Sequence, residues 1–240
     1  MRNFIVFIIL ILIAQMSFAQ GLHIVFADGS RTVLGATPVM NDTEKMESFA
    51  LDQAVVFASQ LHKSFCIYRH ASLDRNFDDK SVGESAEFLI NIVADPILLQ
   101  KYLKELNLVG SEYFQGYNVF FFNTNHESPD VSSNSFSEEI AVNVPSIVVN
   151  DNTIRSIASA SCTKLDEALD TAFKLALSEM SKHQDINVKS MNREITSFQE
   201  QARLLNSENL VENVRFSEIK MFFKNVNNLM SYIVEITMEK

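Results

Sequence analysis

"ALDQAVVFA", residues 50–58, and "ALDTAFKLA", residues 168–176, are identical at five of nine positions. On a helix, their shared alanines recur at i, i+4 and i+8 and form a narrow stripe of small side chains. The two stripes are Ala50, Ala54 and Ala58, and Ala168, Ala172 and Ala176. We therefore predict helices at residues 43–63 and 164–183, each packing its stripe closely against a sheet. Asn41 and Asp42 are capping candidates for the first helix, and Thr163 with Asp166 makes a capping-box pattern for the second.

Similar segments flank the two nonapeptides in the same order. Upstream, "HIVFADGSRTVLGA" (23–36) and "SIVVNDNTIRSIASA" (146–160) each predict a β-hairpin. Downstream come short predicted strands, "SFCIYRH" and "DINVKS", then predicted helices, "DPILLQKYLKEL" (95–106) and "ITSFQEQARLLNSENL" (195–210), then aromatic strands. The sequence "NFDDKSVGES" (76–85) reads as an exposed loop.

This order indicates an internal duplication within an α+β fold. We expect two homologous domains, residues 20–124 and 140–240, joined by a polar linker at 125–139. Each would hold an antiparallel sheet packed by its alanine-striped helix and by a second helix.

The N-terminal sequence "MRNFIVFIILILIAQMSFA" (1–19) has the build of a secretory signal peptide. Arg2 precedes an apolar run from Phe4 to Ala14, and small residues stand at Ser17 and Ala19, so we expect cleavage before Gln20. The other interpretation is an uncleaved anchor, which would hold the protein at a membrane. No later stretch is apolar enough to cross one. The expected location is therefore the periplasm or the outside of the cell.

Composition limits the classes of partner. The chain is 47% hydrophobic with 19 Phe, enough for a sizeable core, and its formal net charge is −10. Nucleic acids and anionic membrane surfaces require clusters of Lys and Arg, which the sequence lacks. We expect an envelope protein or a second copy of the chain as the partner.

His62, Cys66 and His70 would line one face of a continuous helix as candidate metal ligands. The second repeat argues against this, because Ile67 aligns with a predicted strand and His70 would then no longer stack on His62. The other interpretation is a buried cysteine beside surface histidines, without metal or cofactor. Cys66 and Cys162 could form a disulfide if the two repeats packed head to tail in an oxidising compartment.

The sequence shows no nucleophile elbow, paired-histidine metalloprotease pattern, phosphate-binding glycine loop or Cys-x-x-Cys motif. We therefore expect a non-catalytic structural or protein-interaction module. Two alternatives stay open. A carboxylate-based hydrolase of envelope polymers leaves no local signature, and a carrier could hold a small apolar ligand in a Phe-lined pocket between the repeats.

Consecutive aromatic residues on a strand must face both sides of a sheet. Either one side is a partner surface, or the other repeat covers it. The candidate surface residues are Phe120, Phe121, Phe122, Phe222 and Phe223.

Residues 145–240 resemble a bacterial envelope family that includes the twenty-kilodalton membrane-associated lipoprotein, and are similar to the N-terminal domain of the flagellar assembly protein T. The resemblance depends on a small-residue strand at Ser156–Ala160, the Ala-spaced helix with Glu167, Ala168 and Ala172, a strand at Ile186–Val188, and two closing strands. It implies a small α+β envelope domain that binds other proteins or itself and has no catalytic residues. The chain departs from the family pattern by lacking a lipobox cysteine and by carrying two copies.

Overall fold

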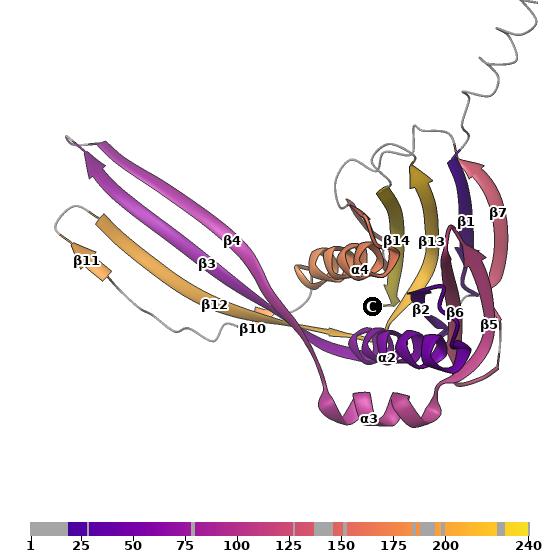
Figure 1. The fold of residues 1–240 in the computed structure, drawn as a ribbon. Coiled ribbons are helices and arrows are strands. Elements are labelled where there is room, and N and C mark those ends of the chain that lie inside the picture. Colours follow the sequence, from indigo (N-terminus) through magenta and orange to yellow (C-terminus); the bar gives the residue numbers. More distant parts are fainter. Residues whose placement is uncertain are drawn as a thin grey trace, which may run out of the picture.

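Three antiparallel sheets and three helices form the part of the chain that the structure describes (Figure 1). The structure is a computed structural model that describes residues 19–27, 29–77, 80–126, 128–136, 146–150, 153–183, 186–187, 195–197, 200–224 and 229–239. Within these ranges, the predicted α+β class with antiparallel sheets is confirmed. The predicted signal peptide lies outside the described residues except for Ala19. No described helix has the length and apolar content needed to cross a membrane.

The largest sheet has six strands in the order β7-β1-β13-β14-β9-β8, and every neighbouring pair is antiparallel. Its strands are β1 (Ala19–Val25), β7 (Asp130–Phe136), β8 (Ser146–Val149), β9 (Thr153–Cys162), β13 (Val214–Lys224) and β14 (Leu229–Glu239). Strands from both predicted repeats therefore pair within one sheet.

A second sheet, in the order β2-β6-β5, has three strands, and β6 is central. The strands are β2 (Val33–Pro38), β5 (Asn107–Phe114) and β6 (Tyr117–Asn123). The third sheet, β10-β12-β3-β4 with β11 paired to β12, consists of β3 (Lys63–Phe77), β4 (Lys80–Ala94), β10 (Ile186–Asn187), β11 (Ile195–Ser197) and β12 (Glu200–Glu212).

The two alanine-striped helices form where the sequence predicts them. They are α2 (Thr43–His62) and α4 (Leu165–Ser181), and all six stripe alanines are buried. The Asp42 side chain caps α2 by accepting a hydrogen bond from the backbone N–H of Lys45 at 3.0 Å. The predicted capping box of α4 is wrong, because Lys164 occupies the cap position and makes no side-chain capping bond.

Close approach of α2 to β2 depends on the absence of a side chain at Gly35. A Cβ atom built there would lie 2.1 Å from the backbone oxygen of Ala50, in the α2 stripe. Helix and strand therefore touch backbone to backbone. The third helix, α3 (Pro96–Glu105), forms within the predicted range 95–106, with Asp95 as its capping residue, and packs against α2.

Four aromatic rings, from α2, α4, β13 and the residue that follows β1, join the two halves of the core. Phe57 of α2 lies 4.7 Å from Phe173 of α4 between ring centroids, and Phe216 of β13 lies 5.5 Å from Phe173. Phe26 contacts Phe216 at 5.6 Å. The core is continuous across the boundary between the predicted repeats.

Several local predictions were wrong. The residues on either side of Asp28-Gly29 do not form a hairpin, because β1 pairs with β7 and β13 while β2 pairs with β6. The predicted helix at 195–210 is replaced, in its described residues, by β11 and β12, and residues 130–136 of the predicted linker form β7. The described residues of the predicted loop at 76–85 belong to β3 and β4. The second predicted hairpin is confirmed as β8 and β9.

β3, β4 and β12 extend from the body as a long, twisted three-stranded structure, which we call the arm (Figure 1). Fifteen residues in each of β3 and β4 correspond to about 50 Å of extended chain. The inner ends of these strands contact α2 and α4, whereas the outer ends lie away from both helices.

Candidate functional site

The arm exposes apolar residues on β4. Every residue from Gly83 to Phe88 is exposed, and Phe88 and Ile90 are 56% and 54% exposed. Adjacent strand residues face opposite sides of a sheet, so β4 is uncovered on both faces between Gly83 and Phe88. Large apolar side chains gathered on an exposed surface are typical of interaction sites.

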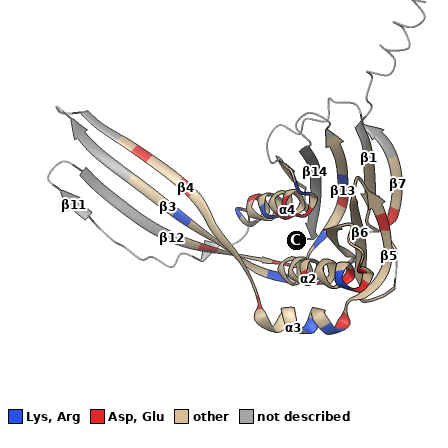
Figure 2. Ribbon diagram, viewed as in Figure 1, with Lys and Arg blue, Asp and Glu red and all other residues tan. Residues whose placement is uncertain are grey.

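β4 is also an edge strand. It pairs with β3 along its length, and the described part of the chain provides no strand on its other side. The backbone N–H and C=O groups of an edge are available to a strand from another chain. Figure 2 shows few charged residues along the described part of the arm.

A buried hydroxyl network holds the inner end of the arm to α4. The Tyr68 hydroxyl lies 2.7 Å from the carbonyl oxygen of Ser178 and 2.6 Å from the Ser181 hydroxyl. The Asn209 side-chain amide donates to the Ser181 carbonyl at 3.2 Å. Burial raises the pKa of Tyr68 above its ordinary value, more than its hydrogen bonds to Ser178 and Ser181 lower it, so the phenol stays neutral and can donate.

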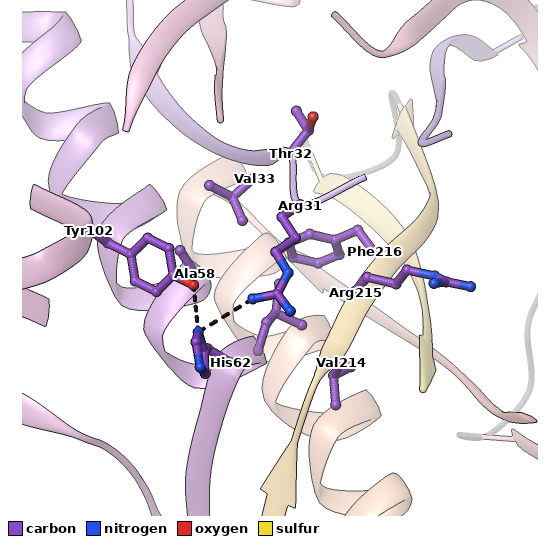
Figure 3. Close-up of a pocket in the computed structure, with 10 residues that line it drawn as sticks. Arg31, Thr32, Val33, Ala58, His62, Tyr102, Val214, Arg215 and Phe216 are labelled. Atoms are coloured by element: carbon purple, nitrogen blue, oxygen red, sulfur yellow. Dashed lines mark hydrogen bonds between the residues drawn. The ribbon is translucent and has the colours of Figure 1, made fainter. Parts of the chain in front are cut away.

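A small pocket lies where the arm leaves the body (Figure 3). His62, the last residue of α2, accepts a hydrogen bond at Nδ1 from the Arg31 guanidinium at 3.4 Å, and Nδ1 lies 2.7 Å from the Tyr102 hydroxyl. A guanidinium can only donate, so Nδ1 carries no proton. The backbone oxygen of His62 accepts from Asn213 N–H at 3.0 Å. Asn213 separates β12 from β13 and adopts a positive φ of 55°.

Burial is the largest cause that lowers the pKa of His62 below its ordinary 6.5, and the positive charges of Arg31 and Lys101 lower it further. The carboxylates of Glu212 and Asp95 act in the opposite direction without reversing the shift. The imidazole is therefore neutral at neutral pH and links α2, α3 and the chain before β2 at the base of the arm.

The pocket offers little scope for chemistry. Its free volume is about 10 Å³, room for roughly one water molecule. Its lining residues include no carboxylate, and the Thr32 hydroxyl already contacts Ser30 and Asn123. The Arg215 side chain extends away from His62 (Figure 3). The pocket is also far smaller than the about 300–1,000 Å³ that ligand sites occupy.

The predicted metal ligands are not brought together. His62 ends α2, whereas Cys66 and His70 lie on β3, where Cys66 is buried and His70 contacts the Ser207 hydroxyl at 2.9 Å. Among the described residues, no group of three or more His, Cys, Asp or Glu side chains could hold a metal ion.

Both cysteines are free thiols in the structure. Cys66 is hydrogen-bonded to Ser181, at the C-terminal end of α4, whereas Cys162 precedes the N-terminal end of that helix. The 17 residues of α4 span about 25 Å, so the predicted disulfide does not form. Burial raises the pKa of the Cys66 thiol to about 11, which keeps it protonated.

The predicted Phe-rich interaction surface is also wrong. Phe120, Phe121 and Phe122 of β6 and Phe222 of β13 are all buried, and Phe223 is half-buried against the core. Both sides of β6 are therefore covered at Phe120–Phe122, and the helix of its own repeat, α2, packs against this strand. The alternative interpretation, in which the other repeat covers these aromatic residues, stays a prediction. Among the exposed aromatic residues that sequence reasoning missed, Phe88 lies on the arm.

No protein-family model matches the chain, and comparisons with curated protein sequences and with solved structures find no significant match.

Proposed function

We propose that this chain is a non-catalytic, exported protein of the cell envelope that acts as a structural or protein-interaction module, with the arm as its interaction element. The observation that carries the proposal is the exposed edge strand β4, with Phe88 and Ile90 more than half exposed. Two sequence features support a location in the cell envelope. They are the resemblance of residues 145–240 to envelope proteins and the signal-like sequence at 1–19.

The geometry of the arm suits interaction better than catalysis. Catalytic groups are effective when they converge in a site that excludes water. The arm instead presents extended backbone and apolar side chains to solvent, and the pocket at its base lacks a carboxylate. Strand addition at a sheet edge is a common mode of protein recognition, because backbone hydrogen bonds give affinity and side chains give specificity.

We also propose that residues 20–124 and 140–240 arose by duplication. The proposal is supported by a shared strand order: β2 precedes α2 and pairs with β6 of the β5-β6 hairpin, while β9 precedes α4 and pairs with β14 of the β13-β14 hairpin. Each striped helix packs on the strand before it. β1 departs from the pattern, since it extends the sheet of the second repeat.

The experiment is site-specific photo-crosslinking in cells that produce the protein. A photoreactive residue at Phe88 should give a crosslinked product. The same residue at Ile97 should not, although Ile97 of α3 is 77% exposed. No product at position 88, or equal products at both positions, would contradict the proposal.

A further inference from the structure

The outer half of β4 keeps its edge open to another strand. Natural sheets block an exposed edge with Pro, a β-bulge or charged side chains, above all Lys. The segment from Gly83 to Leu89 contains neither Lys nor Pro, and its only charged residues are Glu84 and Glu87. The irregularity in the β3-β4 pairing lies inward of this segment, where Ile67 pairs with Asn91 and Tyr68 with Leu89. The regular part of the edge therefore runs outward from Leu89.

Arg69 and Glu84 lie on the same face of the arm but cannot reach each other within a single chain. Arg69 is opposite Phe88, and Glu84 lies four residues further out on β4, on the same face of the sheet as Phe88. Four residues of strand span about 13 Å. Both side chains are exposed, and within the described part of the chain neither makes an ion pair.

We propose that β4 pairs in antiparallel fashion with β4 of a second copy, about a two-fold axis at Ala86. In this register Ala86 faces its own counterpart, Glu84 of each copy faces Phe88 of the other, and Glu87 faces Ser85. No carboxylate is opposite a carboxylate. The pairing is isologous, as is usual for a symmetric dimer.

This register brings Arg69 of one copy close to Glu84 of the other. Phe88 lies beside Arg69, so Arg69 of one copy and the second copy's Glu84 are two strand spacings apart, about 10 Å. The two long side chains can close this distance across the Phe88 ring, which an arginine can also stack upon. Other registers fit less well. A two-fold axis at Glu84 or at Glu87 would place like charges opposite each other. An axis at Ser85, Phe88 or Leu89 would leave Arg69 without the second copy's Glu84.

The inference rests on the proposed function, because it names a second copy of this chain as the partner of the arm. The first test is sedimentation of the full chain across a wide range of concentrations. We expect a dimer for the unchanged protein, monomers for Arg69→Glu and for Glu84→Arg, and a dimer again for the double reversal R69E/E84R. Restoration by the double variant excludes misfolding as the cause of dissociation.

The second test is oxidation of the Ala86→Cys variant, which should give a disulfide-linked dimer because Ala86 lies on the two-fold axis. Ile97→Cys on α3 is the matched control and should not crosslink. An unchanged protein that sediments as a monomer at every concentration, or single charge reversals that still form dimers, would overturn the pairing. If, in addition, position 88 crosslinks to a different protein, the pairing is wrong while the proposed interaction function stands.

Discussion

Replacing Gly35 with Ala tests the backbone contact between β2 and α2. The added Cβ would lie 2.1 Å from the oxygen, 2.6 Å from the carbonyl carbon and 2.7 Å from the Cα of Ala50. All three are backbone atoms, so no side chain can rotate away and the helix itself must move. Overpacking typically costs about 1–3 kcal/mol and occasionally more, and a backbone clash of this size belongs at the upper end.

The variant also gains from a less flexible unfolded chain, by about 0.4–1 kcal/mol. We expect a net loss of about 2–3 kcal/mol in the free energy of unfolding. At about 2–4 °C per kcal/mol for a chain of this size, the melting temperature should fall by roughly 4–12 °C.

The assay is equilibrium unfolding in urea, followed by circular dichroism. Gly110→Ala is the matched control, because a Cβ there would meet only the Phe121 ring, at an ordinary 3.7 Å. A Gly35→Ala variant as stable as Gly110→Ala would refute the close approach of α2 to β2.

Two further substitutions test the base of the arm. Tyr68→Phe removes the hydroxyl that contacts Ser178 and Ser181. The free energy of unfolding should fall by about 1–3 kcal/mol, and amide hydrogen exchange in β3 should become faster. Unchanged exchange would contradict the role of Tyr68 in anchoring the arm. His62 has a lowered pKa when folded, so the unfolded chain binds the proton first and stability should fall as pH drops through 6.5. The His62→Gln variant should lose less stability between about pH 7.5 and about pH 5 than the unchanged protein does. The free energy of unfolding in urea, measured across this pH range, checks the prediction. An equal change with pH in both proteins would refute the role of His62.

The helices were predictable because their signals are local. Alanines four residues apart, flanked by larger apolar side chains, define the buried faces of α2 and α4, and Asp42 marks one start. The pairing of the strands was harder to predict from the sequence. Asp28-Gly29 is a strong local turn signal, but it does not show that β1 joins the strands of the second repeat.

The arm was missed for two reasons. The sequence of β12 is rich in Glu, Gln, Arg and Leu, which favour helices, and its pairing with β3 overrides that preference. The outer ends of β3 and β4 are polar, so they lack the alternating pattern that a half-buried strand shows. Contacts such as His62 with Arg31 and Tyr102, which are 31 and 40 residues away in the chain, leave no pattern in the sequence.

The contrast between Phe88 and the Phe120–Phe122 run shows how position in a sheet decides exposure. Three consecutive aromatic residues suggest a surface, yet they lie on the central strand of the β2-β6-β5 sheet and are buried. Phe88 attracts no attention in the sequence, but it lies on an edge strand beyond the body. The exposure of an aromatic residue in this chain therefore depends on topology more than on composition.

The role of the arm is tested most directly by the mass of the product that a photoreactive residue at Phe88 forms in cells. We predict a crosslinked product at position 88, with twice the mass of the chain, and none at Ile97. The absence of any product at position 88 would contradict the role of the arm.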